Sequence, residues 1–492
     1  MCHIESGDMS MKGTRDFQKC TLNILKSGQS VLIVAPTGLG KTRAALEPFV
    51  QSKNRNGLLG TRLIYTLPLR ALAHGVEEEC KSLGITPVTH HGDEPESEFF
   101  SERAIITTID QYLTAFAGAP LSWAAHMSHA AAGAVLTSYS VFDEVHLLSP
   151  QKGLQLLFAM LYLRKRWGLL SCVMTATLPP SVIEFFQKFC GLVKIEASEK
   201  DIEQRDGWRK VYLQLEVSRS DNGFVWSEKD EKSLAEFVKE KWASWESLGI
   251  DGPQKVIIFI NTVDRAIRVY DELKGLFQNQ GGLEVILAHS RFTRDHRRGV
   301  EKRLSDFFGK TAKPDPAILV TTQVAEAGLN ISAPLVITEL CPMDSLIQRA
   351  GRCQRFNPDG SSERKGKVIV IKPAGDRWFV PYSDKVRLVE VGYNKEGKEK
   401  RNASERFPAI ELTQIVLETE AGNQELLLNW QKEQELIAKA LDPLYKAYLS
   451  GTNDVEFPKS EEPFNSLFAK HKSKRRRTEE IEEEPESETE EE

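Results

Sequence analysis

The chain has 492 residues, of which 41% are hydrophobic and 27% charged, and this composition predicts a soluble globular protein of several domains. The net charge of −6 lies mostly in the stretch from His471 onward, which carries a net −5. The remainder is nearly neutral. Overall charge therefore does not exclude nucleic acid as a ligand, because a local basic groove is enough to bind it.

Two further features exclude other classes of protein. There is no run of about 18 apolar residues, and the opening "MCHIESGDMSMKG" lacks the layout of a signal peptide, so we expect no membrane association. The seven cysteines are scattered and never form Cys-x-x-Cys. This argues against a disulfide framework or a zinc site and indicates a cytoplasmic protein.

The first part of the chain alternates between strand-like and helix-like stretches. Apolar, β-branched runs predict strands at 30–36, 62–68, 104–108, 134–144 and 172–177. Helical stretches separate these runs, which is typical of a parallel sheet covered by helices on both faces.

The first predicted strand leads into a phosphate-binding loop, "APTGLGKT". Gly38 and Gly40 let backbone N–H groups curl around phosphate oxygens, and Lys41 reaches the terminal phosphates. Thr42, at the start of the next helix, can bind Mg²⁺. Ala35 stands where the common pattern has its first glycine. The predicted nucleotide-binding residues are Pro36, Thr37, Gly38, Leu39, Gly40, Lys41 and Thr42.

An acidic pair follows the fourth predicted strand, in "VFDEVHLLSP". Asp143 is placed to hold Mg²⁺ through water, and Glu144 is placed to polarise an attacking water. A solvated acidic turn is the alternative. The catalytic interpretation is favoured because the pair follows the phosphate loop by about a hundred residues and lies at another strand end.

A second alternating series follows the polar stretch 198–210, where we place the linker. Its strands are predicted at 256–262, 284–290, 317–322, 335–340 and 368–372. We therefore expect two similar α/β domains, residues 1–205 and 206–375, which bind their ligand beyond the carboxyl ends of the strands.

The stretch "MDSLIQRAGRCQRF" places Arg349, Arg352 and Arg355 three residues apart. This spacing predicts one face of a short helix, with an anion opposite the three cations. We expect Arg352 and Arg355 to reach the phosphates held by Lys41, where an arginine can accelerate phosphoryl transfer about 10³–10⁵-fold. Gly351 should keep this face open. A solvated basic helix surface is the alternative.

The pattern changes after residue 375. Residues 376–468 have helical apolar spacing and predict a small helical C-terminal region. Residues 469–492 cannot bury a core and predict a disordered acidic tail.

Taken in order, these segments resemble the motifs of a superfamily-2 helicase of the DExH type. The matching segments are "APTGLGKT" (motif I), "LPLRALA" (Ia), "TTIDQ" (Ib), "DEVH" (II), "TAT" (III), "FINT" (IV), "TTQVAEAGLNIS" (V) and "QRAGRCQR" (VI). Details such as "TATLPP" and "AHSRFTRDHR" resemble the CRISPR-associated helicase of type I interference systems. The resemblance implies an α/β fold with two tandem RecA-like domains, each a parallel sheet flanked by helices.

The resemblance also implies an activity and partners. Helicases of this family translocate 3′→5′ on single-stranded DNA with ATP and Mg²⁺. A guide-RNA surveillance complex recruits them to an R-loop, where they unwind the invaded DNA. The resemblance further implies that Gln18 reads adenine, and that Gln348 orders water or the γ-phosphate. Gly328, in motif V, would meet phosphate or ribose.

Nucleic acid should then cross both domains on the face away from ATP, through contacts mainly to phosphate and sugar. The implied contact residues are Pro68, Arg70, Thr108 and Gln111 in the first domain and Thr262, Ser290, Arg291 and Thr321 in the second.

The chain departs from the family pattern at two points. The fused form of the family carries a histidine–aspartate nuclease domain ahead of the helicase, and only about 30 residues precede motif I here. We therefore expect a stand-alone helicase whose cutting is done by a separate histidine–aspartate nuclease subunit. The segment "HHGD" (90–93) has no further clustered histidines, so we do not interpret it as a metal site. Motif V has Gly-Leu-Asn where the family often has Ser-Leu-Asp.

Two other functions use the same two-domain arrangement. One is an RNA-remodelling ATPase. The other is a non-catalytic scaffold that docks a nuclease and uses ATP as a switch. Stimulation of the ATPase by single-stranded DNA would indicate the DNA helicase, and stimulation by RNA would indicate the RNA-remodelling ATPase. Strand displacement distinguishes either of these enzymes from the non-catalytic scaffold.

Overall fold

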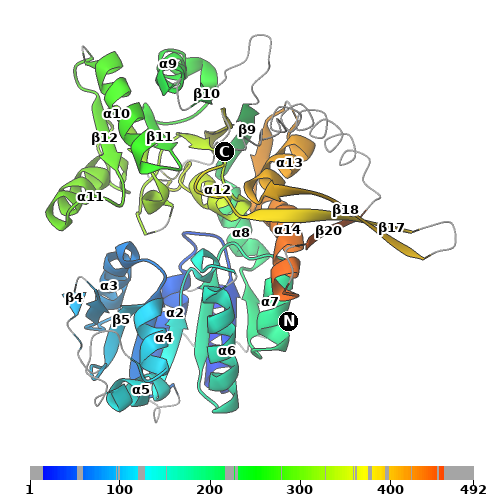
Figure 1. Ribbon diagram of the computed structural model, residues 1–492. Coiled ribbons are helices and arrows are strands. Elements are labelled where there is room, and N and C mark those ends of the chain that lie inside the picture. The colour runs from blue at the N-terminus through cyan, green and yellow to red at the C-terminus, as the bar shows by residue number, and fades with distance from the viewer. Residues whose placement is uncertain are drawn as a thin grey trace, which may run out of the picture.

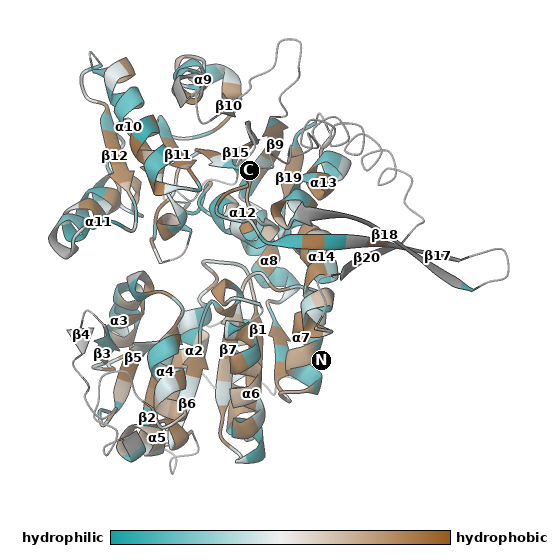
Figure 2. Ribbon diagram, in the orientation of Figure 1, coloured by the Kyte–Doolittle hydropathy of each residue, from teal (hydrophilic) through white to brown (hydrophobic). Residues whose placement is uncertain are grey.

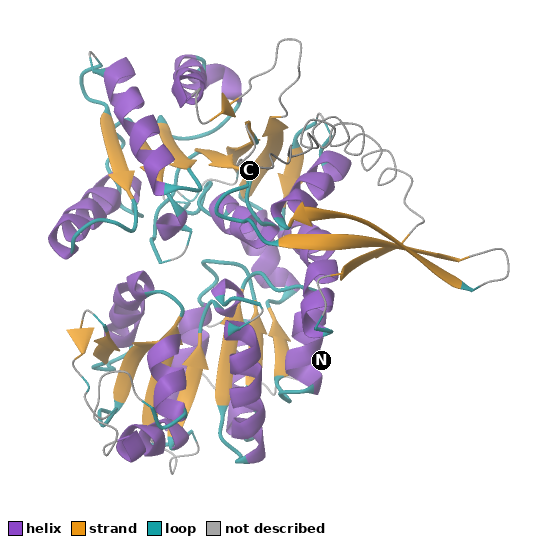
Figure 3. Cartoon of the chain, in the orientation of Figure 1, coloured by secondary structure: helices purple, strands orange, loops and turns teal. Residues whose placement is uncertain are grey.

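The computed structural model describes residues 15–52, 59–92, 94–95, 97, 100–119, 128–150, 152–216, 226–227, 231–278, 280–326, 328–357, 360, 363–374, 379–393, 398–422, 424–451 and 454–458. The predicted disordered tail, residues 469–492, lies outside these ranges, as does Asp93. Within them, no helix is both long enough and apolar enough to cross a membrane. Two sheets, each flanked by helices, form the body of the molecule (Figures 1 and 3).

The first sheet follows the first predicted series. Its strands are β1 (Val31–Val34), β2 (Arg62–Leu67), β3 (Val88–His91), β4 (Glu94–Pro95), β5 (Ala104–Thr108), β6 (Ser138–Phe142), β7 (Ser171–Thr175) and β8 (Val193–Glu196). They lie in the order β4-β3-β5-β2-β6-β7-β1-β8, and neighbours run parallel except for β3 and β4. The predicted parallel sheet is confirmed.

Helices cover both faces of this sheet, because successive side chains of a strand point to opposite faces. Leu32 and Val34 of β1 belong to the core under α4–α7, whereas Val31 and Ile33 belong to the core under α1–α3. Figure 2 shows mostly hydrophobic strands between helices in which hydrophilic and hydrophobic residues are mixed. The helices are α1 (Asp16–Lys26), α2 (Lys41–Ser52), α3 (Ala73–Ser82), α4 (Ile109–Phe116), α5 (Ser128–Leu136), α6 (Gly153–Arg166) and α7 (Pro180–Lys188).

The second sheet repeats this design. Its strands are β9 (Arg209–Glu216), β11 (Lys255–Phe259), β12 (Glu284–Ala288), β13 (Ala317–Thr321), β14 (Leu335–Glu339), β15 (Arg364–Ile371) and β19 (Leu426–Leu428). Their order is β12-β13-β11-β14-β15-β9-β19, parallel except that β19 runs antiparallel to β9. A separate parallel pair joins β10 (Trp226–Ser227) to β16 (Pro373–Ala374).

The two faces of the second sheet pack against different helices. One face packs against α9 (Glu231–Ala243) and α10 (Val263–Phe277). The other packs against α11 (Arg294–Phe308), α12 (Met343–Ala350), α13 (Ile410–Glu420) and α14 (Trp430–Leu449). This second core is continuous with the core under α4–α7 of the first sheet. The two halves are therefore joined by buried apolar contacts as well as by the chain.

All ten predicted strands are present, with two corrections around them. Residues 134–136 end helix α5, so the predicted strand 134–144 begins only at Ser138. The predicted linker, residues 198–210, contains helix α8 (Glu199–Asp206), and β9 begins at its end. The side chain of Ser198 accepts the N–H of Asp201 and caps α8, which explains why this polar stretch is helical.

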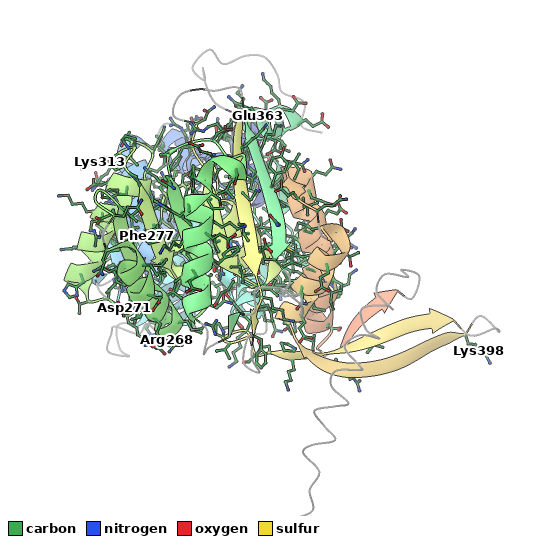
Figure 4. All side chains as sticks on the ribbon, turned by 90° about the horizontal axis from the view of Figure 1, so that it is seen from above. Arg268, Asp271, Phe277, Lys313, Glu363 and Lys398 are labelled. Atoms are coloured by element: carbon green, nitrogen blue, oxygen red, sulfur yellow. The ribbon has the colours of Figure 1, made fainter. Side chains whose placement is uncertain are left out.

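The C-terminal region contains the expected helices, α13 and α14, and also strands that the helical spacing did not predict. β17 (Lys385–Tyr393) pairs antiparallel with β18 (Glu399–Pro408) and parallel with β20 (Asp454–Pro458). The β17–β18 hairpin projects from the body of the molecule, with Lys398 near its far end (Figure 4). β20 packs against α14, so the hairpin is attached to the helix that lies between the two sheets.

Candidate functional site

The phosphate loop turns between β1 and α2, as the sequence predicts. Gly38 and Gly40 both have φ of +84°, a left-handed conformation that favours glycine. Lys41 begins α2, and its Nζ donates to the carbonyl oxygens of Ala35 (3.0 Å) and Pro36 (3.4 Å). The ammonium group is therefore enclosed by the backbone of the loop that the sequence assigns to phosphate.

The acidic pair lies directly after β6, and its first member is anchored by an unpredicted residue. Asp143 Oδ2 accepts the hydroxyl of Tyr65 at 2.6 Å, and Oδ1 accepts the N–H of Glu144 at 2.8 Å. Tyr65 is fully buried in β2, whose neighbour is β6. Burial, with Glu144 adding to it, raises the pKa of Asp143 to about 7. The sequence carries no local signal for this contact, because it depends on β2 and β6 being neighbours in the sheet.

Charged residues of both domains affect the pKa of Glu144. Burial raises its pKa, but nearby cations, Lys41 foremost, outweigh this effect, and the pKa is lower than ordinary. Arg352 and Arg355 of the second domain lower it further. Glu144 is therefore ionised and faces cations from both sheets. Its φ of 46° is left-handed, a strained conformation for a glutamate.

The oxygens at this position fit the predicted Mg²⁺. The Tyr65 hydroxyl interacts with the side chains of both Thr42 and Asp143, so these two predicted metal residues lie together. A hydroxyl and a carboxylate are hard oxygen donors, and Mg²⁺ takes its other ligands from phosphate and water. Among the residues that the structure describes, no group of three or more His, Cys, Asp or Glu could hold a metal ion. His90, in β3, packs edge-on against Phe100.

The three arginines do not share a helix face, which corrects the sequence prediction. Helix α12 ends at Ala350, so Arg349 alone lies within it. The chain then turns into a parallel bridge between Cys353 and Ala333, which lies just before the interior strand β14. The N–H of Ala333 donates to the carbonyl of Arg352 at 3.1 Å. This bridge directs Arg352 and Arg355 away from the line of the helix.

Arg349 is a structural residue, because the carboxylate with which it pairs belongs to its own domain. Its side chain is completely buried and pairs with Glu326 at 2.6 Å. It also donates to the hydroxyl of Thr338 and the side-chain oxygen of Asn261, at 2.8 and 3.0 Å. The guanidinium therefore ties motifs IV, V and VI together.

Arg355 faces the phosphate loop across the domains. It lines a cavity of about 180 Å³ together with Thr37, Gly38, Leu39 and Gly351. A Cβ added to Gly351 would lie 3.2 Å from Oγ1 of Thr37, which explains why a glycine fits this close approach. The expected proximity of motifs I and VI is therefore observed for Arg355.

Arg352 lies deeper than Arg355. Its guanidinium donates to the carbonyls of Leu329 and Glu326, and its Nε is buried without a hydrogen-bond partner. Burial, with Arg355 adding to it, lowers the pKa of Arg352, while Glu144 opposes the shift. Arg352 is thus held by carbonyls of its own domain, and it interacts with the acidic pair through the electrostatic effect of Glu144.

Motif III links motif II to motif VI. His146 Nδ1 lies 3.4 Å from Glu144 Oε2 and 3.3 Å from the hydroxyl of Thr175. Burial lowers the pKa of His146 to about 4, so the imidazole is neutral. The hydroxyl of Thr177 accepts from Nε2 of Gln348 at 3.5 Å. Gln348, for which a role at water or phosphate is implied, therefore contacts the first domain through motif III.

Gln18 lies against the phosphate loop. Its Nε2 donates to the carbonyl of Gly40 at 3.1 Å, and its Oε1 accepts the N–H of Arg15 at 2.9 Å. Arg15 in turn donates to the carbonyl of Leu39. Helix α1 is thereby fixed to the loop through both residues.

The nucleic-acid residues implied by the resemblance divide into surface and interior positions. Arg70, Ser290 and Arg291 are exposed, and Pro68 and Thr262 are half-buried. Thr108 and Gln111 are more than nine-tenths buried. Thr321 is a correction, because its side chain is completely buried and donates to the carbonyl of Ala288 at 3.0 Å inside the sheet.

Gly328 lies apart from the small cavity. It lines a larger one, of about 750 Å³, between α3 and α11, together with Arg70 and Asn330. The structure thus places this motif V glycine beside a residue expected at nucleic acid and not beside the phosphate loop.

A phosphate loop and an acidic pair on one parallel-sheet domain, faced by arginines of a second such domain, are typical of a two-domain motor that binds a nucleoside triphosphate. A sequence profile described as DEAD/DEAH box helicase matches residues 15–185. A second profile, the C-terminal part of the CRISPR-associated nuclease/helicase Cas3, matches residues 252–358. The chain is therefore a superfamily-2 helicase related to the CRISPR-associated helicase Cas3.

Individual relatives agree with this relationship. The chain is 27% identical to the nuclease/helicase Cas3 of Streptococcus thermophilus over 384 residues, which cover 66% of this chain and 39% of that protein. It is 25% identical to the helicase Cas3 of Thermoproteus tenax over 374 residues, which cover 72% and 57%. A crystal structure of T. fusca Cas3 with ATP covers 94% of this chain and 55% of its own, with a TM-score of 0.62 and 18% identity. The chain thus spans about two-fifths to three-fifths of these relatives, and the structural match shows the shared fold.

Proposed function

We propose that this protein hydrolyses ATP to move along single-stranded DNA, 3′→5′, and unwinds target DNA in type I CRISPR interference. In this proposal a guide-RNA surveillance complex opens the DNA as an R-loop, and a separate histidine–aspartate nuclease subunit cuts it. The observation that carries the ATPase part is the cavity in which Arg355 and Gly351 meet Thr37, Gly38 and Leu39. Solved relatives include Cas3 with AMPPNP and a chain of an RNA-guided surveillance complex, which support ATP and that partner.

Each charged residue of the site has a distinct task in this proposal. Lys41 binds the terminal phosphates, while Thr42 and Asp143 hold Mg²⁺, which neutralises phosphate charge when bound. Glu144 polarises the attacking water, because its pKa is lower than ordinary and the carboxylate is ionised. Arg352 and Arg355 neutralise charge that develops on the γ-phosphate. Since these groups come from two domains, nucleotide favours closure and hydrolysis removes that preference.

The experiment that tests the proposal measures ATPase activity with single-stranded DNA, with RNA and without nucleic acid. We expect DNA to stimulate turnover and Lys41→Ala to abolish it while the far-ultraviolet circular dichroism stays unchanged. Displacement of a labelled strand with a free 3′ or 5′ overhang then reports unwinding and direction. Stimulation by RNA alone would favour an RNA-remodelling ATPase, and stimulation without displacement would favour the scaffold.

The hydrogen bond from Tyr65 to Asp143 gives a pH prediction. Tyr65 donates to the ionised carboxylate and so lowers the pKa of Asp143 below the value that burial alone would produce. Loss of this hydrogen bond in Tyr65→Phe should raise the pKa of Asp143 by about one unit, measured by titration of the carboxyl group in protein without Mg²⁺ and nucleotide. Tyr139→Phe is the matched control, because Tyr139 is also buried but donates to the carbonyl of Ala45. If the pKa of Asp143 in Tyr65→Phe equalled that in Tyr139→Phe, the proposed effect of Tyr65 on Asp143 would be wrong.

Arg291 gives a prediction for DNA binding. It follows β12, and its exposed side chain pairs with exposed Asp264, an interaction that contributes little to stability. Arg291→Ala should weaken binding of single-stranded DNA and reduce the slope of log Kd against log salt by about one, with the KM for ATP unchanged. Arg303→Ala is the control, because Arg303 pairs with Glu284 at the opposite end of the same strand. If Arg291→Ala and Arg303→Ala bound single-stranded DNA with equal affinity, Arg291 would not lie on the DNA path.

A further inference from the structure

The turn that carries Arg352 is held from behind by another arginine. Arg209, at the start of β9, is buried, and its Nη2 donates to the carbonyl of Ala350 at 2.8 Å. Its Nε donates to the carbonyl of Cys353 at 3.1 Å. These two carbonyls flank Gly351 and Arg352 in the sequence. One planar guanidinium therefore spans both ends of the turn between α12 and the Ala333 bridge.

The position of Arg209 depends on a carboxylate from the C-terminal helix. Glu433, in the first turn of α14, is 2% exposed, and its Oε1 accepts from Arg205 at 2.8 Å. The same oxygen lies 3.5 Å from Nη1 of Arg209. Arg205 also pairs with Asp206 at 3.0 Å. Two buried guanidiniums thus meet two carboxylates, and Glu433 is the carboxylate that both guanidiniums share.

Charge makes this arrangement sensitive to Glu433. Burial lowers the pKa of Arg209, Arg205 lowers it further, and Glu433 opposes both effects. A neutral residue at 433 would leave two guanidiniums close together with less compensation, which is costly in a buried position. Glu433 is the carboxylate that pairs with Arg209, so its loss weakens the hold on Arg209 and, through Arg209, the hold on the carbonyls of Ala350 and Cys353.

Helix α14 is well placed for such a role because it is fixed to both domains. The N–H of Trp430 donates to Asp206 Oδ2 at 2.9 Å, which ties the start of α14 to α8. Gln434 Nε2 donates to the carbonyl of Ala176, in motif III, at 3.2 Å. Further along, Asp442 Oδ1 accepts the N–H of Ser181 at 2.6 Å. α14 also packs against α12, so a single helix contacts the surroundings of motifs III and VI (Figure 1).

We propose that Glu433, acting through Arg209, positions Arg352 for nucleotide hydrolysis. This inference rests on the proposed ATPase function and adds the C-terminal helix to the site. Glu433 is a positioning residue, because it does not line the cavity beside the phosphate loop, whereas Arg209 lines that cavity as well as holding the turn. Together, Glu433 and Arg209 fix the carbonyls of Ala350 and Cys353, which lie on either side of Arg352, the residue proposed to act on the nucleotide.

The test is a double-mutant cycle with Glu433→Gln and Arg352→Ala, measured as DNA-stimulated ATPase. Glu433→Gln alone should lower kcat about 10- to 100-fold, with little change in the KM for ATP, because displacement of a catalytic group costs rate more than binding. The double variant should be no slower than Arg352→Ala alone, within about threefold, because the two residues act as a unit. Glu435→Gln is the matched control, since Glu435 lies on the same helix but pairs at the surface with Lys432 and Lys439.

Hydrogen exchange supplies a readout that does not depend on catalysis. Amides of the segment 350–354 should exchange about tenfold faster in Glu433→Gln than in Glu435→Gln. If Glu433→Gln does not fold, Arg209→Lys tests the same link, because lysine keeps the charge but cannot span two carbonyls.

The outcomes separate the two proposals. A wild-type chain without ATPase activity would overturn the proposed function, and with it the role of Glu433 in hydrolysis. With active wild type, a normal kcat in Glu433→Gln would overturn the positioning role alone. Additive losses in the double variant would also overturn it, because Glu433 would then act independently of Arg352. Unchanged exchange at 350–354 would rule out the route through the turn.

Discussion

Glu144→Gln should lower the turnover of ATP about 10²–10⁴-fold while nucleotide binding is retained, because the variant loses the base that polarises water but keeps the shape of the side chain. Binding should become tighter. Glu144 now places a negative charge among Lys41, Arg352 and Arg355, and removing it leaves these cations to the phosphates alone. Single-turnover hydrolysis and the dissociation rate of a fluorescent ATP analogue measure the two effects separately.

The control for this variant is Glu196→Gln. Glu196 also ends a strand of the first sheet, but it is an exposed residue that pairs with Lys194. It should hydrolyse ATP as the wild type does. Turnover of Glu144→Gln within about threefold of Glu196→Gln would contradict the role of Glu144, because general-base catalysis contributes at least about 10²-fold.

Arg352→Ala should lower the DNA-stimulated kcat by about 10³-fold or more, as expected when an arginine that neutralises transition-state charge is removed. Arg352 also donates to the carbonyls of Leu329 and Glu326, so a modest loss of thermal stability should accompany the loss of rate. Arg352→Lys keeps the charge but not the fork of donors, and we expect it to recover stability more than activity. Steady-state kinetics and thermal unfolding of the same preparations measure both.

Arg349→Ala provides the contrast. It removes one partner of a fully buried ion pair and leaves Glu326 uncompensated, which costs about 3–5 kcal/mol of unfolding free energy. Its main effect should therefore be on stability, whereas the main effect at position 352 should be on rate. If both variants lost stability equally and showed the same kcat when folded, the distinction between a structural and a catalytic arginine would be wrong.

The sequence was most informative where one strand and its turn determine the chemistry. The phosphate loop and the acidic pair follow β1 and β6 as predicted, because a run of buried apolar residues and the polar residues after it form a local signal. The spacing of the three arginines was a misleading signal. Three-residue spacing describes a helix only while the helix continues, and here the bridge to Ala333 ends it after Ala350.

Residues that act through distant partners could not be found in this way. Tyr65 and Asp143 are far apart in the chain, and their contact depends on β2 and β6 being neighbours in the sheet. Glu433 and Arg209 are separated further, and a glutamate within the all-polar stretch 431–435 is ordinarily expected to be solvated. For Thr321 the sequence suggested a role that the side chain does not have in the structure. It was expected to contact nucleic acid because it is a motif residue at a strand end, but its hydroxyl points into the sheet and donates to the carbonyl of Ala288.

The pairing of β19 with β9 has a practical consequence for anyone who divides the protein. Residues 426–428 complete the far side of a sheet whose other strands all precede residue 372, so the second lobe is not contiguous in the gene. A fragment that ends between residues 372 and 426 would lack β19 and leave β9 as an exposed edge strand. Its unpaired backbone groups could pair with other chains and cause aggregation. Such a truncation should yield insoluble material, whereas a fragment that extends through α14 should remain soluble.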